Sequence, residues 1–223
     1  MSETRIRSER HLPALVHLEE LEWTPSPMPG VARKMLERVG EEVALATTVV
    51  KYAPESHFSS HTHEKGEEFL VLEGIFSDEH GDYPVGTYIR NPPGSSHAPF
   101  SKEGCTIFVK LRYMKPTETE RVLIHPHGAP WREIGEGWTS LLMFCDPAGD
   151  ETVTLEQLSA GATLSWELGQ GGVEILVVEG SCEDENQRYT TGSWLRLPKS
   201  GMWQLQSPEG CLLWAKRHHL PAA

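Results

Sequence analysis

The sequence predicts an all-β protein made of two small antiparallel barrels in tandem. The first observation is that 20 glycines and 16 prolines separate short segments rich in β-branched residues, which is typical of strands joined by turns. The second is that the latter half of the chain repeats the former. With 223 residues, the chain is long enough to form two modest domains, each with its own core.

The strands of the first half follow from composition and turn signals. Residues 44–52 form the clearest β-branched run, and a Pro-Glu-Ser turn separates this run from a strand expected over 58–63. Residues 1–22 allow a short helix or an edge strand. The remaining expectations are strands over 68–74, 86–90 and 105–110, a hairpin tip over 76–83 and a polar linker over 115–120.

A shift of 106 residues superimposes the second half on the first without a gap. It places Gly172 to Gly180 over Gly66 to Gly74, and 17 of the 47 positions between 66 and 112 are identical. Identity this high over an ungapped shift indicates one supersecondary unit used twice. We therefore predict an N-terminal domain over residues 1–115 and a C-terminal domain over residues 116–223.

Four side chains of the first half are spaced as ligands of one metal ion. His61 and His63 lie at i and i+2 on an expected strand, so both imidazoles point to the same face. A Lys-Gly step then turns the chain and brings a carboxylate, Glu67 or Glu68, beside them. His97 follows a Pro-Pro-Gly turn that folds a later strand back over the first. Three imidazoles and one carboxylate inside a barrel form a cage for a divalent transition metal.

The repeat discriminates between the two glutamates. Under the 106-residue shift, Glu68 is retained as Glu174, whereas Glu67 is replaced by Val173. None of the other candidate ligands is retained. A residue that persists where no ion can bind serves the fold, so Glu67 is the expected ligand and Glu68 a structural neighbour. The other lost positions are His61, His63 and His97, which become Glu167, Gly169 and Trp203.

We expect the second barrel to hold no metal. Trp203, together with Trp166 or Trp194, is expected to fill the space that the ion takes in the first barrel.

Other residues near the motif have two readings. Tyr83, Arg90 and His57 are candidates for a second layer around the ion, against the alternative that they pack or face solvent. His125 and His127 form another His-x-His pair, but they lie among prolines with no carboxylate three or four residues on. We expect that pair on the surface of the linker.

The candidate ligands match the two cupin motifs. The first, Gly-x5-His-x-His-x3-Glu-x6-Gly, is present from His61 onward, with Glu55 in place of the leading glycine. The second, Gly-x5-Pro-x-Gly-x2-His-x3-Asn, begins at Gly86 and includes His97, but ends in Ser101 instead of Asn.

The wider sequence resembles the cupin domain of ChrR-type anti-sigma factors. The resemblance is specific over residues 23–113, including Glu67 to Gly74 and Arg90 to His97, and is weaker over 131–219. It implies a tandem bicupin in which each repeat is a jelly-roll (double-stranded β-helix) barrel, with the ion between the sheets of the first.

ChrR proteins bind an extracytoplasmic-function sigma factor through a separate N-terminal helical domain with a His-x3-Cys-x2-Cys zinc motif. This sequence has no such motif, and about 22 leading residues are too few to form that domain. The resemblance therefore covers the sensing half and does not extend to the part that holds a sigma factor.

Charge and composition exclude several classes of partner. A net charge of −12 argues against nucleic acid and against an anionic membrane surface, because both require a basic face. The first 21 residues lack the apolar core of a signal peptide, and the four cysteines form no Cys-x-x-Cys pair. We expect a cytoplasmic protein with reduced, mostly packed thiols, and a homodimer.

Two functions follow from these features. The first, implied by the ChrR resemblance, is a metal-containing sensor or regulator that responds to a reactive oxygen species or a small-molecule ligand. The second is a mononuclear Fe(II) dioxygenase acting on a small carbonyl or enol compound. The expected metal is zinc first, then iron, nickel or manganese, since imidazole with one carboxylate suits each of them.

Overall fold

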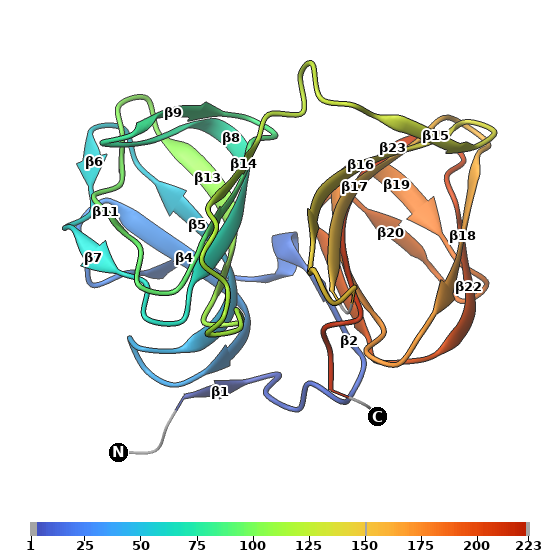
Figure 1. Cartoon of the computed structure of the whole chain (residues 1–223), viewed down its shortest axis with the longest axis horizontal. Helices are drawn as coiled ribbons and strands as arrows, with labels where there is room; N and C mark the ends of the chain where they lie inside the picture. The colour runs from blue at the N-terminus through green and yellow to red at the C-terminus, as the bar shows by residue number, and fades with distance from the viewer. Residues whose placement is uncertain (1–3, 150, 222–223) are drawn as a thin grey trace. The chain divides into compact units, whose positions relative to one another are not determined.

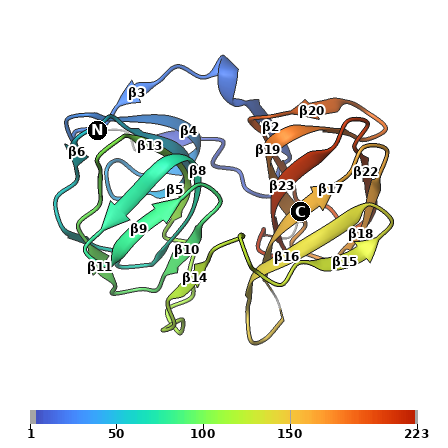
Figure 2. The same ribbon diagram turned by 90° about the horizontal axis from the view of Figure 1, so that it is seen from above.

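The chain folds into two β-barrels. The computed structural model describes residues 4–149 and 151–221, and in them it contains strands and one short 3₁₀-helix, η1 (Leu18–Glu20), with no α-helix. One compact unit comprises residues up to Ser8 with Leu21–His127, and the other comprises Glu9–Glu20 with the chain from Gly128 onward. The predicted all-β tandem architecture is confirmed (Figures 1 and 2).

The first unit consists of one long curved sheet and a smaller facing layer. Its main sheet has the order β1-β4-β5-β13-β8-β10-β14, and β3, β6, β9 and β12 pair at its edges. A separate two-stranded ladder, β7 with β11, carries part of the candidate site. The strands are β1 (Arg5–Ile6), β3 (Thr24–Pro25), β4 (Val31–Val39), β5 (Leu45–Tyr52), β6 (Ser56–His57), β7 (His61–Thr62), β8 (Glu67–Asp78), β9 (Gly81–Pro84), β10 (Tyr88–Asn91), β11 (Ser96–His97), β12 (Phe100–Ser101), β13 (Cys105–Leu111) and β14 (Val122–Ile124).

The second unit repeats this arrangement. Its main sheet has the order β15-β16-β17-β23-β19-β21-β2, and β18, β20 and β22 form the facing layer with the end of β19. The strands are β2 (Ala14–His17), β15 (Arg132–Gly135), β16 (Trp138–Cys145), β17 (Thr152–Leu158), β18 (Thr163–Leu168), β19 (Val173–Glu183), β20 (Arg188–Thr190), β21 (Ser193–Leu197), β22 (Gly201–Gln206) and β23 (Cys211–Arg217).

Strand register reproduces the repeat found in the sequence. Cys105 of β13 pairs with Tyr52 of β5, and its counterpart Cys211 of β23 pairs with Leu158 of β17. Both units also contain the same β-bulge, where β8 pairs with β13 and where β19 pairs with β23. The 106-residue shift therefore describes the backbone as well as the sequence.

A glycine fixes the backbone beside each bulge. Gly74 has φ +67° and its counterpart Gly180 has φ +72°. A Cβ at either position would lie 2.1 Å from a carbonyl oxygen, that of Gly104 or of Gly210. Only glycine fits because L side chains disfavour this conformation and no space exists for a side chain.

Each barrel is filled mainly by apolar side chains. In the first unit, Phe69, Phe76 and Tyr83 are among the buried cluster, whereas in the second Trp166 and Trp203 are buried with their ring centroids 6.0 Å apart. Trp203 and Trp166 thus pack in the core of the second barrel, and their expected place in the space that the ion takes in the first barrel stays a prediction. Trp194 lies outside that cluster and donates a hydrogen bond to Glu174 instead.

The N-terminal segment contributes to both sheets. Within residues 1–22, β1 pairs with β4 of the first unit, and β2 pairs with β21 as the last strand of the second unit's main sheet. After the polar segment 115–120, β14 pairs with β10 of the first unit. The division at residue 115 predicted from the sequence stays a prediction.

The four cysteines are free. Cys105, Cys182 and Cys211 are buried and Cys145 is exposed, which confirms that most of the thiols are packed. Burial raises the pKa of the Cys105 thiol to about 11, so it remains protonated and unreactive at neutral pH. Among the described residues, no helix is long and apolar enough to span a bilayer.

Candidate metal centre

The β7–β11 ladder brings two of the predicted ligands face to face. His61 lies directly opposite His97, and Ser96 lies opposite Thr62. The predicted strand over 58–63 is shorter than expected, because β7 comprises only His61 and Thr62. His63 still continues the ladder, since its backbone N–H donates to the Ser95 carbonyl at 2.8 Å. The ladder thereby places three imidazoles at one end of the barrel.

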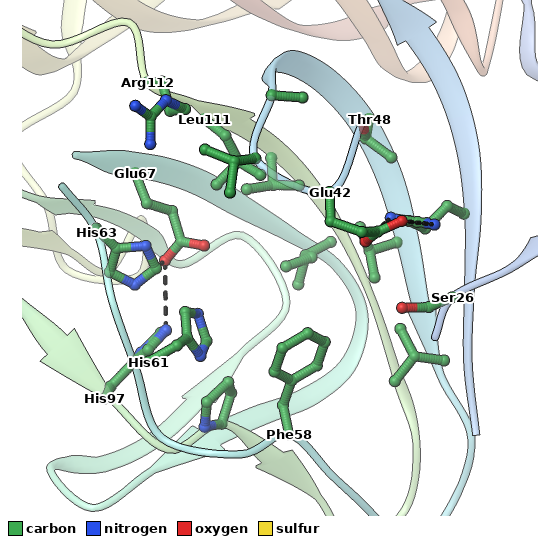
Figure 3. Close-up of a pocket in the computed structure, with 18 of the residues that line it drawn as sticks. Ser26, Glu42, Thr48, Phe58, His61, His63, Glu67, His97, Leu111 and Arg112 are labelled. Atoms are coloured by element: carbon green, nitrogen blue, oxygen red, sulfur yellow. Dashed lines mark hydrogen bonds and ion pairs between the residues drawn. The ribbon is translucent and has the colours of Figure 1, made fainter. Parts of the chain in front are cut away.

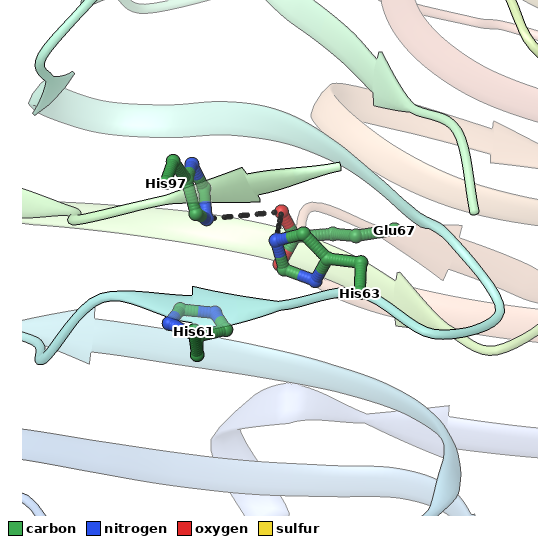
Figure 4. A group of neighbouring side chains, drawn as sticks. All are labelled: His61, His63, Glu67 and His97. Carbon is green, nitrogen blue, oxygen red and sulfur yellow. Dashed lines mark ion pairs between the residues drawn. The ribbon is translucent and has the colours of Figure 1, made fainter. Parts of the chain in front are cut away.

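Glu67 approaches these imidazoles from the main sheet, at the first residue of β8. Its Oε2 lies 3.3 Å from Nε2 of His63 and 3.5 Å from Nε2 of His97. The three ring centroids are 4.8–5.1 Å apart, and the four side chains converge on one point (Figure 4). Sequence spacing thus predicted correctly which residues come together.

The donor atoms suit a metal ion. One donor from each of the four residues lies within 4.8 Å of the others, and donors around one ion at bond lengths of about 2.1 Å lie roughly 3–4 Å apart. Nε2 of His63 and Nε2 of His97 are buried and form no hydrogen bond, although both face a carboxylate oxygen. A cation among these atoms would satisfy all of them, so the residues present fit a divalent metal.

Histidine tautomers are set by the groups behind the rings. His61 Nδ1 lies 2.9 Å from the Ser59 carbonyl, and His97 Nδ1 lies 3.2 Å from Oδ2 of Asp78. Because both partners accept hydrogen bonds, each Nδ1 carries the proton and each Nε2 presents a lone pair to the centre.

Charge and burial act differently on two of the imidazoles. Burial lowers the pKa of His63, and the neighbouring His97 and His61 add to this effect although Glu67 opposes it. Burial also lowers the pKa of His97, but the hydrogen bond to Asp78 and the charges of Glu67 and Asp78 outweigh it and raise the value. His63 is thus held as the neutral imidazole that a metal requires.

A chain of hydrogen bonds behind the cluster connects Glu67 to His97. Asn91 donates to Glu67 at 3.2 Å, and Arg121 donates to Asn91 at 3.1 Å and to the Tyr83 hydroxyl at 2.9 Å. Tyr83 in turn donates to Asp78 at 2.9 Å. Since Asp78 accepts from His97, the chain of hydrogen bonds runs from Glu67 to His97.

Of the three residues that the sequence suggested as a second layer around the ion, only Tyr83 belongs to this chain of hydrogen bonds. Arg90 instead pairs with Glu68 at 2.7 Å and with Glu118, and His57 is exposed and stacks on Phe100. The other two members, Asn91 and Arg121, and the acceptor Asp78 were not singled out as site residues.

Glu68 lies away from the cluster, as expected for a structural residue. Its Oε2 accepts hydrogen bonds from Tyr88 at 2.6 Å and from Arg90 at 2.7 Å, all within the buried interior. The counterpart Glu174 accepts from Trp194 at 2.8 Å. Glu67, not Glu68, faces the imidazoles.

A cavity of about 400 Å³ adjoins the cluster and lies within the first unit. All four candidate ligands line it, and its remaining wall includes apolar side chains of β5 and β13 such as Val50, Ile107 and Val109. Figure 3 shows the cluster on one side of this pocket, with Thr48, Ser26 and Glu42 on the other. A small molecule in the pocket would therefore reach the metal position.

The family model for the ChrR cupin-like domain matches residues 11–115 and, a second time, residues 119–221. The chain belongs to the ChrR cupin-like family. Each match covers most of one of the two barrels. A search of curated proteins gave no match.

Solved structures share the bicupin fold at low sequence identity. A candidate dioxygenase from Nostoc punctiforme is 12% identical, with a TM-score of 0.73 over 95% of this chain and 83% of its own. The pirin YhhW of Escherichia coli, in complex with nickel(II), is 12% identical with a TM-score of 0.72 over 95% and 100%. Oxalate decarboxylase OxdC of Bacillus subtilis is 12% identical with a TM-score of 0.63 over 94% and 78%. At this identity the likeness shows the fold.

Proposed function

We propose that this ChrR cupin-like protein is a mononuclear metal enzyme of the dioxygenase type that acts on a small carbonyl or enol compound. The pocket that opens onto all four candidate ligands is the observation that carries the proposal. A zinc site that only stabilises a fold is closed by its protein ligands, whereas a catalytic site keeps room for water or substrate. A bound divalent ion would supply Lewis-acid chemistry toward a chelating substrate and the redox chemistry that dioxygen requires.

The protein's own residues would bind and orient the ligand. His61, His63, Glu67 and His97 would hold the ion, and Asp78 would fix the His97 ring with its Nε2 toward the centre. Apolar side chains along β5 and β13 would exclude water from the substrate body. Similarity to a candidate dioxygenase and to oxalate decarboxylase adds fold-level support.

A direct test combines metal analysis with oxygen uptake. Protein purified without added metal is analysed for its elements, then loaded anaerobically with Fe(II), and oxygen uptake is measured with β-diketones and α-hydroxy ketones. We expect one divalent ion per chain and uptake that requires both the ion and His97. The proposal would be contradicted if the purified protein held zinc at full occupancy and if no oxygen uptake followed with any of these compounds after Fe(II) loading.

The second candidate function is a metal-containing sensor. The match of both halves to the ChrR cupin-like model favours it, because the resemblance covers the sensing half of those regulators. In this case the ion and the pocket would bind a ligand without converting it. Tight, metal-dependent ligand binding with no product by mass spectrometry would support the sensor over the enzyme.

A further inference from the structure

The wall of the pocket that faces the cluster is built from β4 and β5 and carries two arginines. Arg33 pairs with Val50, and Arg38 pairs with Ala46. A one-residue bulge in β4 separates the arginines and changes the side-chain alternation between them, so that two residues five positions apart share one face. Both arginines line the pocket.

Two buried polar atoms on this wall have no hydrogen-bond partner. They are Nε of Arg33 and the hydroxyl oxygen of Thr48. Arg33 uses its two terminal nitrogens on Glu42, at 3.2 and 3.4 Å, and leaves Nε free. Buried donors without partners are costly and uncommon, so atoms of this kind in a pocket wall mark the place of a ligand's polar group.

The charged side chains of this wall differ in their exposure to solvent. The side chain of Arg33 is only 15% exposed and Arg38 is 4% exposed, whereas the Glu42 side chain between them and solvent is 62% exposed. Burial lowers the pKa of Arg38, and the neighbouring Arg33 lowers it further, although Glu42 and Glu41 oppose the shift. The guanidinium groups of the wall are thus mostly buried, whereas the Glu42 carboxylate that pairs with Arg33 is largely exposed.

The register gives the distance from this wall to the candidate metal ligands. Arg33, Val50, Ile107 and Val71 lie in one row across β4, β5, β13 and β8. Three strand spacings separate the first and last, or about 14 Å between Cα atoms along the sheet. Glu67 lies four residues before Val71 on β8, or about 13 Å along the strand, so a ligand that touches both Arg33 and the cluster must be elongated.

We propose that the ligand of this pocket is an elongated carboxylate. Its metal-binding end lies at the histidine cluster, its apolar body packs along β5 and β13, and its carboxylate binds Arg33 and Thr48 in place of Glu42. The planar guanidinium offers Nε and a terminal nitrogen side by side, which matches the two oxygens of a carboxylate. This assignment rests on the proposed function for the metal-binding end only.

The test compares two matched probes by calorimetry on the zinc-loaded full chain. One probe is a β-diketone with an alkyl tail that ends in a methyl group, and the other has a carboxylate in place of that methyl. Both are prepared in a series of tail lengths. We expect the carboxylated probe to bind about 10- to 100-fold more tightly at one tail length, as for a charged hydrogen-bonded pair.

Variants separate the arginine wall from the metal. Arg33→Gln should abolish the preference for the carboxylate and leave the neutral probe's affinity unchanged, which also reports an intact pocket. Glu42→Gln should strengthen binding of the carboxylated probe alone, because it removes the competing anion. Thr48→Val should weaken the same probe by a smaller factor, since it removes a neutral hydrogen bond.

The outcomes distinguish this inference from the proposed function. Equal affinity of the two probes at every tail length, or a preference that survives Arg33→Gln, would overturn the carboxylate site even if the neutral probe requires metal. Carboxylate binding that needs Arg33 but persists in metal-free protein would uphold the site and count against the metal-dependent function. Failure of both probes to bind would overturn both.

Discussion

Asp78 lies 3.2 Å from Nδ1 of His97 and ends the strand that begins at Glu67. Strand β8 therefore carries a candidate metal ligand at its start and the residue that orients another ligand at its end. It can do so because it leaves one layer for the other, pairing with β10 and β13 in its first part and with β9 in its last.

The first prediction concerns this contact. Asp78→Asn should weaken metal binding by about 10- to 100-fold, because the amide no longer anchors the His97 ring through an ionised acceptor. Competition with a chelating dye measures the affinity. Asp184→Asn, the equivalent change in the second barrel, is the matched control and should leave metal affinity unchanged. An equal effect of both variants would show that fold stability, not ring orientation, is responsible.

The second prediction separates adjacent glutamates. Glu67→Gln should lower the metal content and leave unfolding of the metal-free protein nearly unchanged. Glu68→Gln should cost about 3 kcal/mol in the free energy of unfolding, because it leaves Arg90 with one fewer buried carboxylate, and should spare the metal. Elemental analysis and urea denaturation measure the two effects. If the two variants exchange these phenotypes, the assignment of Glu67 as the ligand is wrong.

The third prediction is a pH dependence in the second barrel. Burial raises the pKa of Asp184, but hydrogen bonds from the Asn186 backbone, Trp203 and Tyr189 outweigh this and lower it. A lowered pKa in the folded state adds stability above the ordinary aspartate value of about 3.9, and that stability is lost as pH falls through the folded value. Asp184→Asn should therefore destabilise the barrel by about 1–2 kcal/mol near neutral pH.

The difference between wild type and Asp184→Asn should shrink below about pH 4. Tryptophan fluorescence reports on this barrel, because every tryptophan except Trp23 lies after residue 130. A gap between the two proteins that stays constant from neutral pH to acid would contradict the assigned role of the carboxylate.

The fourth prediction tests the pocket without touching a charged group. Val50→Phe should reduce ligand affinity more than about tenfold, because the larger ring occupies space in the cavity that Val50 lines, and should leave metal content unchanged. Calorimetry with the neutral β-diketone measures the affinity. Leu142→Phe, at an exposed position of the second unit, is the control and should have no effect.

The internal repeat distinguished the candidate ligand from its structural neighbour, but it did not identify the residue that orients a ligand. Loss of Glu67 and retention of Glu68 in the second copy correctly separated the residue that faces the imidazoles from the structural one. The same reasoning would have set Asp78 aside, because it persists as Asp184. The structure gives the reason: the Trp203 indole donates to Asp184 at 3.2 Å, in the place of the imidazole that contacts Asp78. One acceptor serves a candidate ligand in one barrel and a core tryptophan in the other.

Arg121 shows what the sequence did not indicate. It lies just beyond the polar segment 115–120, in no motif, yet it donates to both Asn91 and Tyr83. Contacts of this kind depend on how a segment returns over the barrel, and neither periodicity nor spacing encodes that path.

The sequence by itself determined the two-barrel architecture, the register of the repeat and the four side chains that meet at one end of the first barrel. These follow from local rules, since strand alternation, turn residues and a fixed repeat are written in neighbouring positions. Only the tertiary structure decided that a pocket opens onto the cluster, that Asp78 orients His97 and that Arg33 lines the same pocket. Each of these joins strands distant in sequence, and their relation is set by sheet curvature and by a β4 bulge that no local pattern announced.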